Sequence, residues 1–312
     1  MEQLDIALGT MFYGTRVDEQ TSFDLLDRFV AAGGRLIDTA NCYAFWVDPS
    51  GRGGQSEAVV GRWLARRHGV RDQVVISTKV GAEPTVPGVW PDSAEGLSAR
   101  AIKAAAQASL GRLGTDRLDL YWTHVEDRTV PLEETVGALA ELVADGTVGR
   151  LGVSNHPVWR VERARQLARA NGQVGYSAIQ LRHSYVRPRP GATPDPSHRL
   201  VNEEVLDYVR GDGELALWAY TALLGGAYTR PDRPLHEAYD HPGTTRRLAV
   251  LNQVAGELGV SANQVVLAWL LGGDPPAVPI VGVSSAAQLD EACAGAALVL
   301  PEEQRRRLDA VT

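Results

Sequence analysis

"DTANCYAFWVDPSGRGGQSE", residues 38–57, contains the join that repeats along this chain: an apolar strand ends, a loop follows and a helix starts. Seven further short apolar runs precede a longer helical pattern in the same way. The eight strand candidates are residues 4–10, 35–40, 73–79, 117–124, 147–154, 176–181, 214–220 and 277–283. This eightfold alternation predicts a closed (β/α)8 TIM barrel with long βα loops at its C-terminal face, because open doubly wound sheets usually have fewer strands. The composition does not change along the chain, so we expect one domain over residues 1–312.

Start and stop signals of helices support the alternation. Ser98 and Gly114 have the places of an N-cap and a left-handed stop. Ser261 and Gln264 have the spacing of a capping box. In the opening stretch, the glycine-rich run leads into a helix that we expect to be capped near Ser56.

The charge and the cysteines limit the class of protein. A formal net charge of −7 argues against nucleic acid and acidic membrane surfaces, because both select basic patches. The two cysteines, Cys42 and Cys293, lack metal-like or redox spacing, so we expect no metal site and no disulfide framework. With no signal-like N-terminus and no apolar run of the ~18 residues that span a bilayer, the sequence predicts a soluble cytoplasmic protein.

Four polar residues stand where the second, third and fourth strands end: Asp38, Tyr43, Lys79 and His124. Singly, each has an ordinary structural explanation, such as a helix cap, loop packing or a solvated rim. Together at the mouth of a barrel they predict an acid–base site. A buried lysine needs a carboxylate nearby, and its ammonium would lower the pKa of the phenol, which is ~10 in water. These groups therefore predict a tuned proton donor beside an imidazole that orients a substrate oxygen.

Successive motifs in the chain, LIDTANCY, VISTKV, DLYWTH and GRLGVSN, resemble the hallmarks of the aldo-keto reductase family. The resemblance covers nearly the whole chain and is closest to the branch with bacterial reductases and potassium-channel beta subunits. It implies an NADPH-dependent oxidoreductase that reduces an aldehyde or ketone to an alcohol. In that reaction Tyr43 is the implied general acid, Lys79 and Asp38 tune it, and His124 orients the carbonyl.

The same resemblance implies a nicotinamide cofactor extended across the barrel mouth, with NADPH preferred and NADH as the alternative. The residues that it assigns to the cofactor are Thr10, Met11, Asp38, Ser154, Asn155, Gln180, Tyr220, Thr221, Ala222, Leu223, Gly225, Gly282, Ser284, Ser285, Gln288 and Glu291. Among these, Tyr220 matches the aromatic that stacks on the nicotinamide ring. Residues 282–291 contain no Lys or Arg for a 2′-phosphate, and Ala292 stands where many relatives carry an Asn that meets adenine.

Aromatic residues on the loops beside the strand ends are candidates for the wall of the substrate pocket: Phe45, Trp46 and Trp90. Their alternative is packing on their own loops. Trp122 shares the strand parity of His124 and is expected to fill the barrel instead. The glycines of loop 41–55 make it a candidate lid that orders over a ligand.

Two other functions stay open from the sequence. A nucleotide-binding regulatory subunit would keep the fold and the cofactor but have little turnover. A barrel that uses Lys79 as a Schiff base would need a neutral amine, which a nearby carboxylate opposes. The sequence predicts a small-molecule carbonyl substrate, but it identifies neither the compound nor the oligomeric state.

Overall fold

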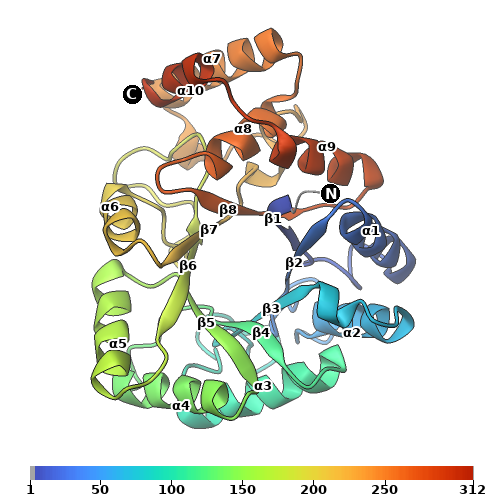
Figure 1. Cartoon of the computed structure of the whole chain (residues 1–312), viewed down its shortest axis with the longest axis vertical. Coiled ribbons are helices and arrows are strands. Elements are labelled where there is room, and N and C mark those ends of the chain that lie inside the picture. Colours follow the sequence, from blue (N-terminus) through green and yellow to red (C-terminus); the bar gives the residue numbers. More distant parts are fainter. Residues whose placement is uncertain (1–3, 312) are drawn as a thin grey trace.

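Eight parallel strands close into a barrel in the computed structural model, which describes residues 4–311 (Figure 1). The strands are β1 (Leu4–Gly9), β2 (Gly34–Asp38), β3 (Val75–Val80), β4 (Leu118–Thr123), β5 (Val148–Ser154), β6 (Tyr176–Arg182), β7 (Ala216–Tyr220) and β8 (Ala277–Gly282). Each strand pairs with the next along the chain, and β8 pairs with β1. The predicted (β/α)8 barrel is therefore confirmed, with every strand end within two residues of its predicted position. The predicted domain limits, residues 1 and 312, lie outside the described residues.

Helices surround the ring of strands (Figure 1). Within residues 4–311 they are α1 (Glu19–Ala31), α2 (Gln55–Arg66), α3 (Ala99–Leu113), α4 (Leu132–Ala144), α5 (Val158–Ala170), α6 (Glu203–Asp212), α7 (Pro242–Leu258), α8 (Ala262–Leu271), α9 (Ala286–Ala297) and α10 (Glu302–Asp309), with short 3-10 turns η1 (Arg71–Gln73), η2 (Leu224–Gly226) and η3 (Glu237–Tyr239). Among these described elements, no single helix is long and apolar enough to cross a bilayer; only the pair α7 and α8, bent by 99°, passes by combined length and composition.

The predicted caps explain where several helices begin and end. The Ser98 side chain accepts a hydrogen bond from the Ala101 amide at the start of α3, and Gly114 ends that helix at a φ of 63°. Ser261 and Gln264 form the predicted capping box before α8. These local signals confirm that helix boundaries follow from side-chain chemistry in the sequence.

The start of α2 differs from the prediction. Its N-cap is Gly54, which has a left-handed φ of 107°, and Ser56 lies in the first turn, fully buried. The Ser56 hydroxyl lies 2.7 Å from the hydroxyls of both Thr10 and Thr39. Ser56 is therefore not a cap; it ties α2 to the ends of β1 and β2, because its hydroxyl faces the barrel rather than the helix terminus.

Apolar side chains form one core on each side of the strand ring, and a small third cluster around Cys42 and Phe45 lies in the loops after β2 and β3. The larger core lies between the strands and the helices, and a smaller one fills the barrel. Trp122 belongs to the inner core, where its ring lies 5.4 Å from that of Trp218. The expectation that Trp122 fills the barrel is therefore confirmed, and the C-terminal strand ends stand above this filling.

Candidate active site

The Lys79 ammonium joins the residues that the sequence placed at the barrel mouth. It donates hydrogen bonds to Asp38 Oδ2 at 2.6 Å, to the Thr39 carbonyl at 2.7 Å and to Tyr43 Oη at 3.0 Å. The side chains of Lys79 and Asp38 are 0% and 1% exposed. All three ammonium protons therefore have acceptors, as a charge so deeply buried requires.

Asp38 is fixed from its other oxygen as well. Ser77, on β3, donates to Asp38 Oδ1 at 2.9 Å and accepts a hydrogen bond from Trp122 Nε1 at 2.6 Å. Gln180, on β6, lies at the limit of hydrogen bonding, with its amide nitrogen 3.5 Å from the same oxygen. Ser77 was not predicted as a site residue, although it lies on β3 two residues before Lys79 and therefore on the same face of the strand.

His124 directly follows β4, and its ring centre lies 5.9 Å from that of Tyr43. Burial and the nearby Lys79 hold the pKa of His124 well below its usual value, so the imidazole is neutral. Its Nδ1 lies 3.4 Å from the Cys42 thiol, whose own pKa is raised by burial. Because a neutral thiol donates, Nδ1 accepts and the ring proton is assigned to Nε2, which leaves that atom as a donor.

The ionisation of Tyr43 differs from the prediction. The sequence predicted that the Lys79 ammonium would lower the pKa of the phenol. Instead, burial and then the negative charge of Asp38 hold the pKa of Tyr43 well above its usual value. Desolvation outweighs the single ammonium contact, so the phenol stays protonated.

Residues expected at the nicotinamide end are connected directly to this group. Asn155 donates to the His124 carbonyl at 3.1 Å and to Ser154 Oγ at 3.1 Å, and it accepts from the Tyr220 hydroxyl at 2.7 Å. Asn155 also has a left-handed φ of 57°, an uncommon backbone conformation at the end of β5. The structure thus brings Ser154, Asn155, Gln180 and Tyr220 together around the tetrad of Asp38, Tyr43, Lys79 and His124. Their contacts with a cofactor stay predictions.

The turn after β7 has the backbone form expected of an anion-binding loop. Thr221, Leu224, Gly225 and Gly226 all have left-handed φ values, between 50° and 95°. Leu223, with a φ of −101° and a ψ of 13°, directly precedes left-handed Leu224. Such a right-handed and left-handed pair turns its amide N–H groups toward a common side, as in anion-binding nests. Among the other assigned residues of this turn, Ala222 is buried and Leu223 is half-buried.

Residues expected at the adenosine end lie after β8. Gly282 ends that strand, and Ser285 is the N-cap of α9. The Ser284 amide and hydroxyl donate to the Gln288 side chain at 2.8 and 3.2 Å. Both serines are exposed, so this terminus is open to a ligand.

Two assigned positions have their polar groups engaged within the protein. Thr10 is fully buried, beside half-buried Met11, and donates to the Asp38 carbonyl at 3.0 Å. Glu291 accepts from Ser261 Oγ at 2.5 Å and from Asn263 Nδ2 at 3.1 Å. The Thr10 bond goes to the end of β2 and the Glu291 bonds go to the start of α8, so cofactor contacts by Thr10 and Glu291 remain predictions.

The aromatic residues of the predicted substrate wall differ in exposure. Phe45 is 8% exposed and Trp90 is half-buried, whereas Trp46 is 46% exposed. The Trp46 ring packs edge-to-face on Tyr43 at 6.3 Å and on Phe45 at 5.1 Å. Trp46 therefore presents most of the open aromatic surface beside the phenol, and Phe45 supports it from behind.

Loop 41–55 is bonded to the loop that follows β3. Both carboxylate oxygens of Glu83 accept from the Gly53 amide, at 3.0 and 3.1 Å, and Glu95 accepts from Asn41 Nδ2 at 2.7 Å. Arg52 donates to two carbonyls of the same neighbouring loop. No motif in the sequence indicates these partners, which lie 30 or more residues apart. The lid motion of loop 41–55 stays a prediction. Such a motion would have to break these hydrogen bonds.

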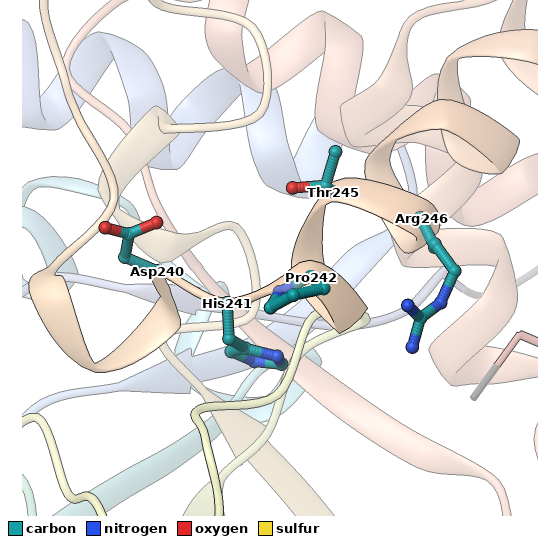
Figure 2. Close-up of a pocket in the computed structure, with 5 residues that line it drawn as sticks. All are labelled: Asp240, His241, Pro242, Thr245 and Arg246. Carbon is teal, nitrogen blue, oxygen red and sulfur yellow. The ribbon is translucent and has the colours of Figure 1, made fainter.

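No group of three or more His, Cys, Asp or Glu residues in the described part of the chain could hold a metal ion. A surface hollow at the start of α7 is lined by Asp240, His241, Pro242, Thr245 and Arg246 (Figure 2). None of its lining residues belongs to a strand end, and Asp240 and Arg246 lie at its opposite ends in Figure 2. The hollow is thus separate from the tetrad, which is the chemically organised part of the barrel mouth.

Comparisons with known proteins cover almost the entire chain. The model of the Aldo/keto reductase family matches residues 5–312. The chain is 32% identical to a norsolorinic acid reductase of Emericella nidulans, over 96% of this chain and 76% of the relative. It is 29% identical to an uncharacterized oxidoreductase of Bacillus subtilis, over 97% of this chain and 90% of the relative. It is also 30% identical to an aryl-alcohol dehydrogenase of Pestalotiopsis microspora, over 85% of this chain and 65% of the relative.

Proposed function

The chain belongs to the aldo/keto reductase family, and we propose that it is an NADPH-dependent carbonyl reductase that converts an aldehyde or ketone to an alcohol. The observation that carries the proposal is the buried Lys79–Tyr43 contact of 3.0 Å, with Asp38 behind it. Family membership supports an oxidoreductase, and the names of relatives denote a reductase and an alcohol dehydrogenase.

The proton in this reaction comes from Tyr43. Because Lys79 donates to the phenol oxygen, the phenol proton is left for another acceptor, the carbonyl oxygen of the substrate. The raised pKa of Tyr43 keeps the proton on the phenol until negative charge develops on that oxygen. The ammonium then stabilises the phenolate that forms, because the two atoms are already in contact.

His124 orients the same oxygen. A neutral imidazole with its proton on Nε2 donates a hydrogen bond without competing as an acid. Two donors, the phenol and the imidazole, would then point at one carbonyl oxygen. This arrangement fixes the carbonyl carbon in one position and stabilises charge on the oxygen.

A bound nicotinamide cofactor would supply the hydride for the carbonyl carbon, and Tyr43 would give its proton to the carbonyl oxygen, which completes the alcohol. Ser154, Asn155 and Gln180 would hold the carboxamide of the nicotinamide and Tyr220 its ring, since they lie around the tetrad. The left-handed turn after β7 and the open serines before α9 fit the phosphates. NADPH rather than NADH is proposed from the family resemblance. Arg230 and Arg233, two cations of the loop after β7, both lie within salt-bridge distance of Asp232.

Turnover of purified protein tests the proposal. We expect loss of NADPH absorbance with a panel of aromatic and aliphatic aldehydes, and faster loss with NADPH than with NADH. Tyr43→Phe should lower kcat by about 10²- to 10⁴-fold, because it removes the general acid, and leave the Kd for NADPH unchanged. Tyr121→Phe is the matched control, since its buried hydroxyl donates to the Ile102 carbonyl, away from the site.

Two outcomes would contradict the proposal. Carbonyl reduction by Tyr43→Phe at the wild-type rate would remove Tyr43 as the acid. Tight NADPH binding with no turnover of any aldehyde would favour the regulatory subunit instead. The cytoplasmic location stays a prediction, which cell fractionation tests.

A further inference from the structure

A row of side chains leads from the proposed catalytic phenol to the outer edge of the barrel mouth. The Tyr43 ring lies 6.3 Å from Trp46, and Trp46 lies 6.5 Å from Phe12, both edge-to-face. The Arg16 guanidinium lies over the Phe12 ring, 4.5 Å from its centre. The row therefore passes from a proton donor through two apolar rings to a cation.

The aromatic part of this row is open. Trp46 is 46% exposed, although its ring is packed between Tyr43, Phe12 and Phe45. An indole held in place by three rings exposes a rigid apolar face, and covering that face removes apolar area from water. A flat apolar ligand with its carbonyl at Tyr43 would cover it.

The cation at the end of the row has no carboxylate partner among the described residues. Its two acidic neighbours in sequence are committed elsewhere: Asp18 caps α1 through Thr21, and Glu19 pairs with Arg62. Arg16 itself is exposed, and its guanidinium contacts the ring of Phe12. In a chain of net charge −7, such an unneutralised cation attracts anions to this side of the mouth.

The opposite side of the mouth differs in this respect. There Arg128, Arg160 and Arg199 all lie within 3.5 Å of Glu126, so their charges are shared with one carboxylate. Arg16 differs from these three arginines because its contact is an aromatic ring of the row and not a carboxylate.

We infer that the row Tyr43–Trp46–Phe12–Arg16 selects the substrate, and that it selects carbonyl compounds with a flat apolar body and an anionic group at the end remote from the carbonyl. Trp46 and Phe12 bind the body, and Arg16 binds the anion. The inference rests on the proposed reductase function for the placing of the carbonyl at Tyr43. It assigns to Arg16 a role in specificity.

A matched pair of aldehydes tests the role of Arg16. In the presence of NADPH, the wild-type protein should have a kcat/KM for 6-formyl-2-naphthoate about fivefold above that for 2-naphthaldehyde, which is the size expected of one exposed ion pair. In Arg16→Gln this ratio should fall to about one, and in Arg16→Lys it should remain above one. Arg150→Gln, an exposed arginine on β5, is the control and should keep the wild-type ratio.

A binding measurement separates this inference from the proposed function. The Kd values of the two corresponding alcohols, read by quenching of tryptophan fluorescence with NADP⁺ present, should show the same preference and the same loss in Arg16→Gln. Preference in binding without any turnover would reject the reductase and keep the selective row. Equal Kd values in the wild type, or a weaker Kd for NADPH in Arg16→Gln with an unchanged ratio, would overturn the inference.

Discussion

The loops that follow β2 and β3 are bonded to each other, whereas the exposed serines between β8 and α9 bond to the first turn of α9, directly beside them in the sequence. In the first region Glu83, Glu95 and Arg52 connect loop 41–55 to residues 81–95. In the second, the Ser284 amide and hydroxyl both bond to Gln288, four residues further on. The difference teaches that the proton donor is held in place by the protein itself. The region proposed for the cofactor leaves its exposed groups for a ligand to complete.

The largest effect is expected when the buried ion pair of Lys79 and Asp38, in the first region, is broken. Asp38→Asn leaves the Lys79 ammonium buried without a carboxylate, so we expect the free energy of unfolding to fall by about 3–5 kcal/mol. Urea denaturation measures it. Asp290→Asn removes a carboxylate from the half-exposed pair with Arg28 and should lower it by less than about 1 kcal/mol. Similar losses of unfolding free energy in the two variants would show that the buried pair contributes no more to stability than the exposed one.

A second test compares one glycine from each region. A Cβ at Gly53 would lie 2.4 Å from the Asn41 carbonyl oxygen, so Gly53→Ala must force the bonded loops apart. We expect the free energy of unfolding to fall by about 1–3 kcal/mol. A Cβ at Gly282 meets only the Gly9 carbonyl at 3.8 Å, so Gly282→Ala should change stability by less than about 0.5 kcal/mol. The comparison fails if thermal unfolding shifts equally in both.

The third test measures how the residues after β8 contribute to the binding of NADPH. Gln288→Ala removes the acceptor that holds Ser284, and we expect the Kd for NADPH to rise about three- to tenfold, as for one lost hydrogen bond. Stability should stay within about 0.5 kcal/mol of the wild type, because the site is exposed. Gln166→Ala, on α5, is the control. Titration of NADPH by fluorescence gives the Kd, and an unchanged value would contradict the assignment.

The smallest expected effect is a dependence of stability on pH, caused by Glu83 in the bonded loops. Burial raises the pKa of Glu83 from 4.5 to about 7, while the Gly53 amide, Arg112 and Arg52 oppose this rise and Glu95 adds to it. Between these values the unfolded chain has lost the Glu83 proton and the folded chain keeps it. The contribution of Glu83 to stability therefore falls as the pH rises from about 4.5 to about 7.

Glu83→Gln cannot ionise, so its stability relative to the wild type should increase across that window. Urea midpoints at pH 5 and pH 8 measure the change. The exposed Glu237→Gln serves as the control and should show the wild-type dependence on pH. Parallel curves for Glu83→Gln and the wild type would show that the carboxylate is not a buried acid in the folded protein.

The fold could be predicted from the sequence because each barrel strand is buried on both faces and therefore reads as a short apolar run. The convergence of Asp38, Lys79 and His124 was also predictable, since residues at the ends of neighbouring parallel strands must lie at one mouth. Partners across loops could not be predicted, as Glu83 and Gly53 show. Loop conformation, not periodicity, brings such pairs together.

The two predictions that the structure corrects fail for a common reason. Ser56 has the composition of a cap, but the left-handed Gly54 leaves its hydroxyl facing the barrel. Tyr43 has the ammonium neighbour that lowers a pKa, but the depth of its burial decides the sign. The direction of the Ser56 hydroxyl and the burial of the Tyr43 phenol both depend on how the strands and loops pack around these residues. That packing exists only in the assembled barrel.

The hydrogen bonds from Trp122 to Ser77 and from Ser77 to Asp38 have a consequence for how such a barrel can diverge. Another large apolar ring at position 122 could fill the same volume, yet it would leave Ser77 without its donor and loosen the carboxylate beneath the phenol. Descendants of this chain are thus not free to exchange interior bulk by size alone. A substitution of Trp122 inside the barrel would therefore also change the surroundings of Asp38 and Tyr43.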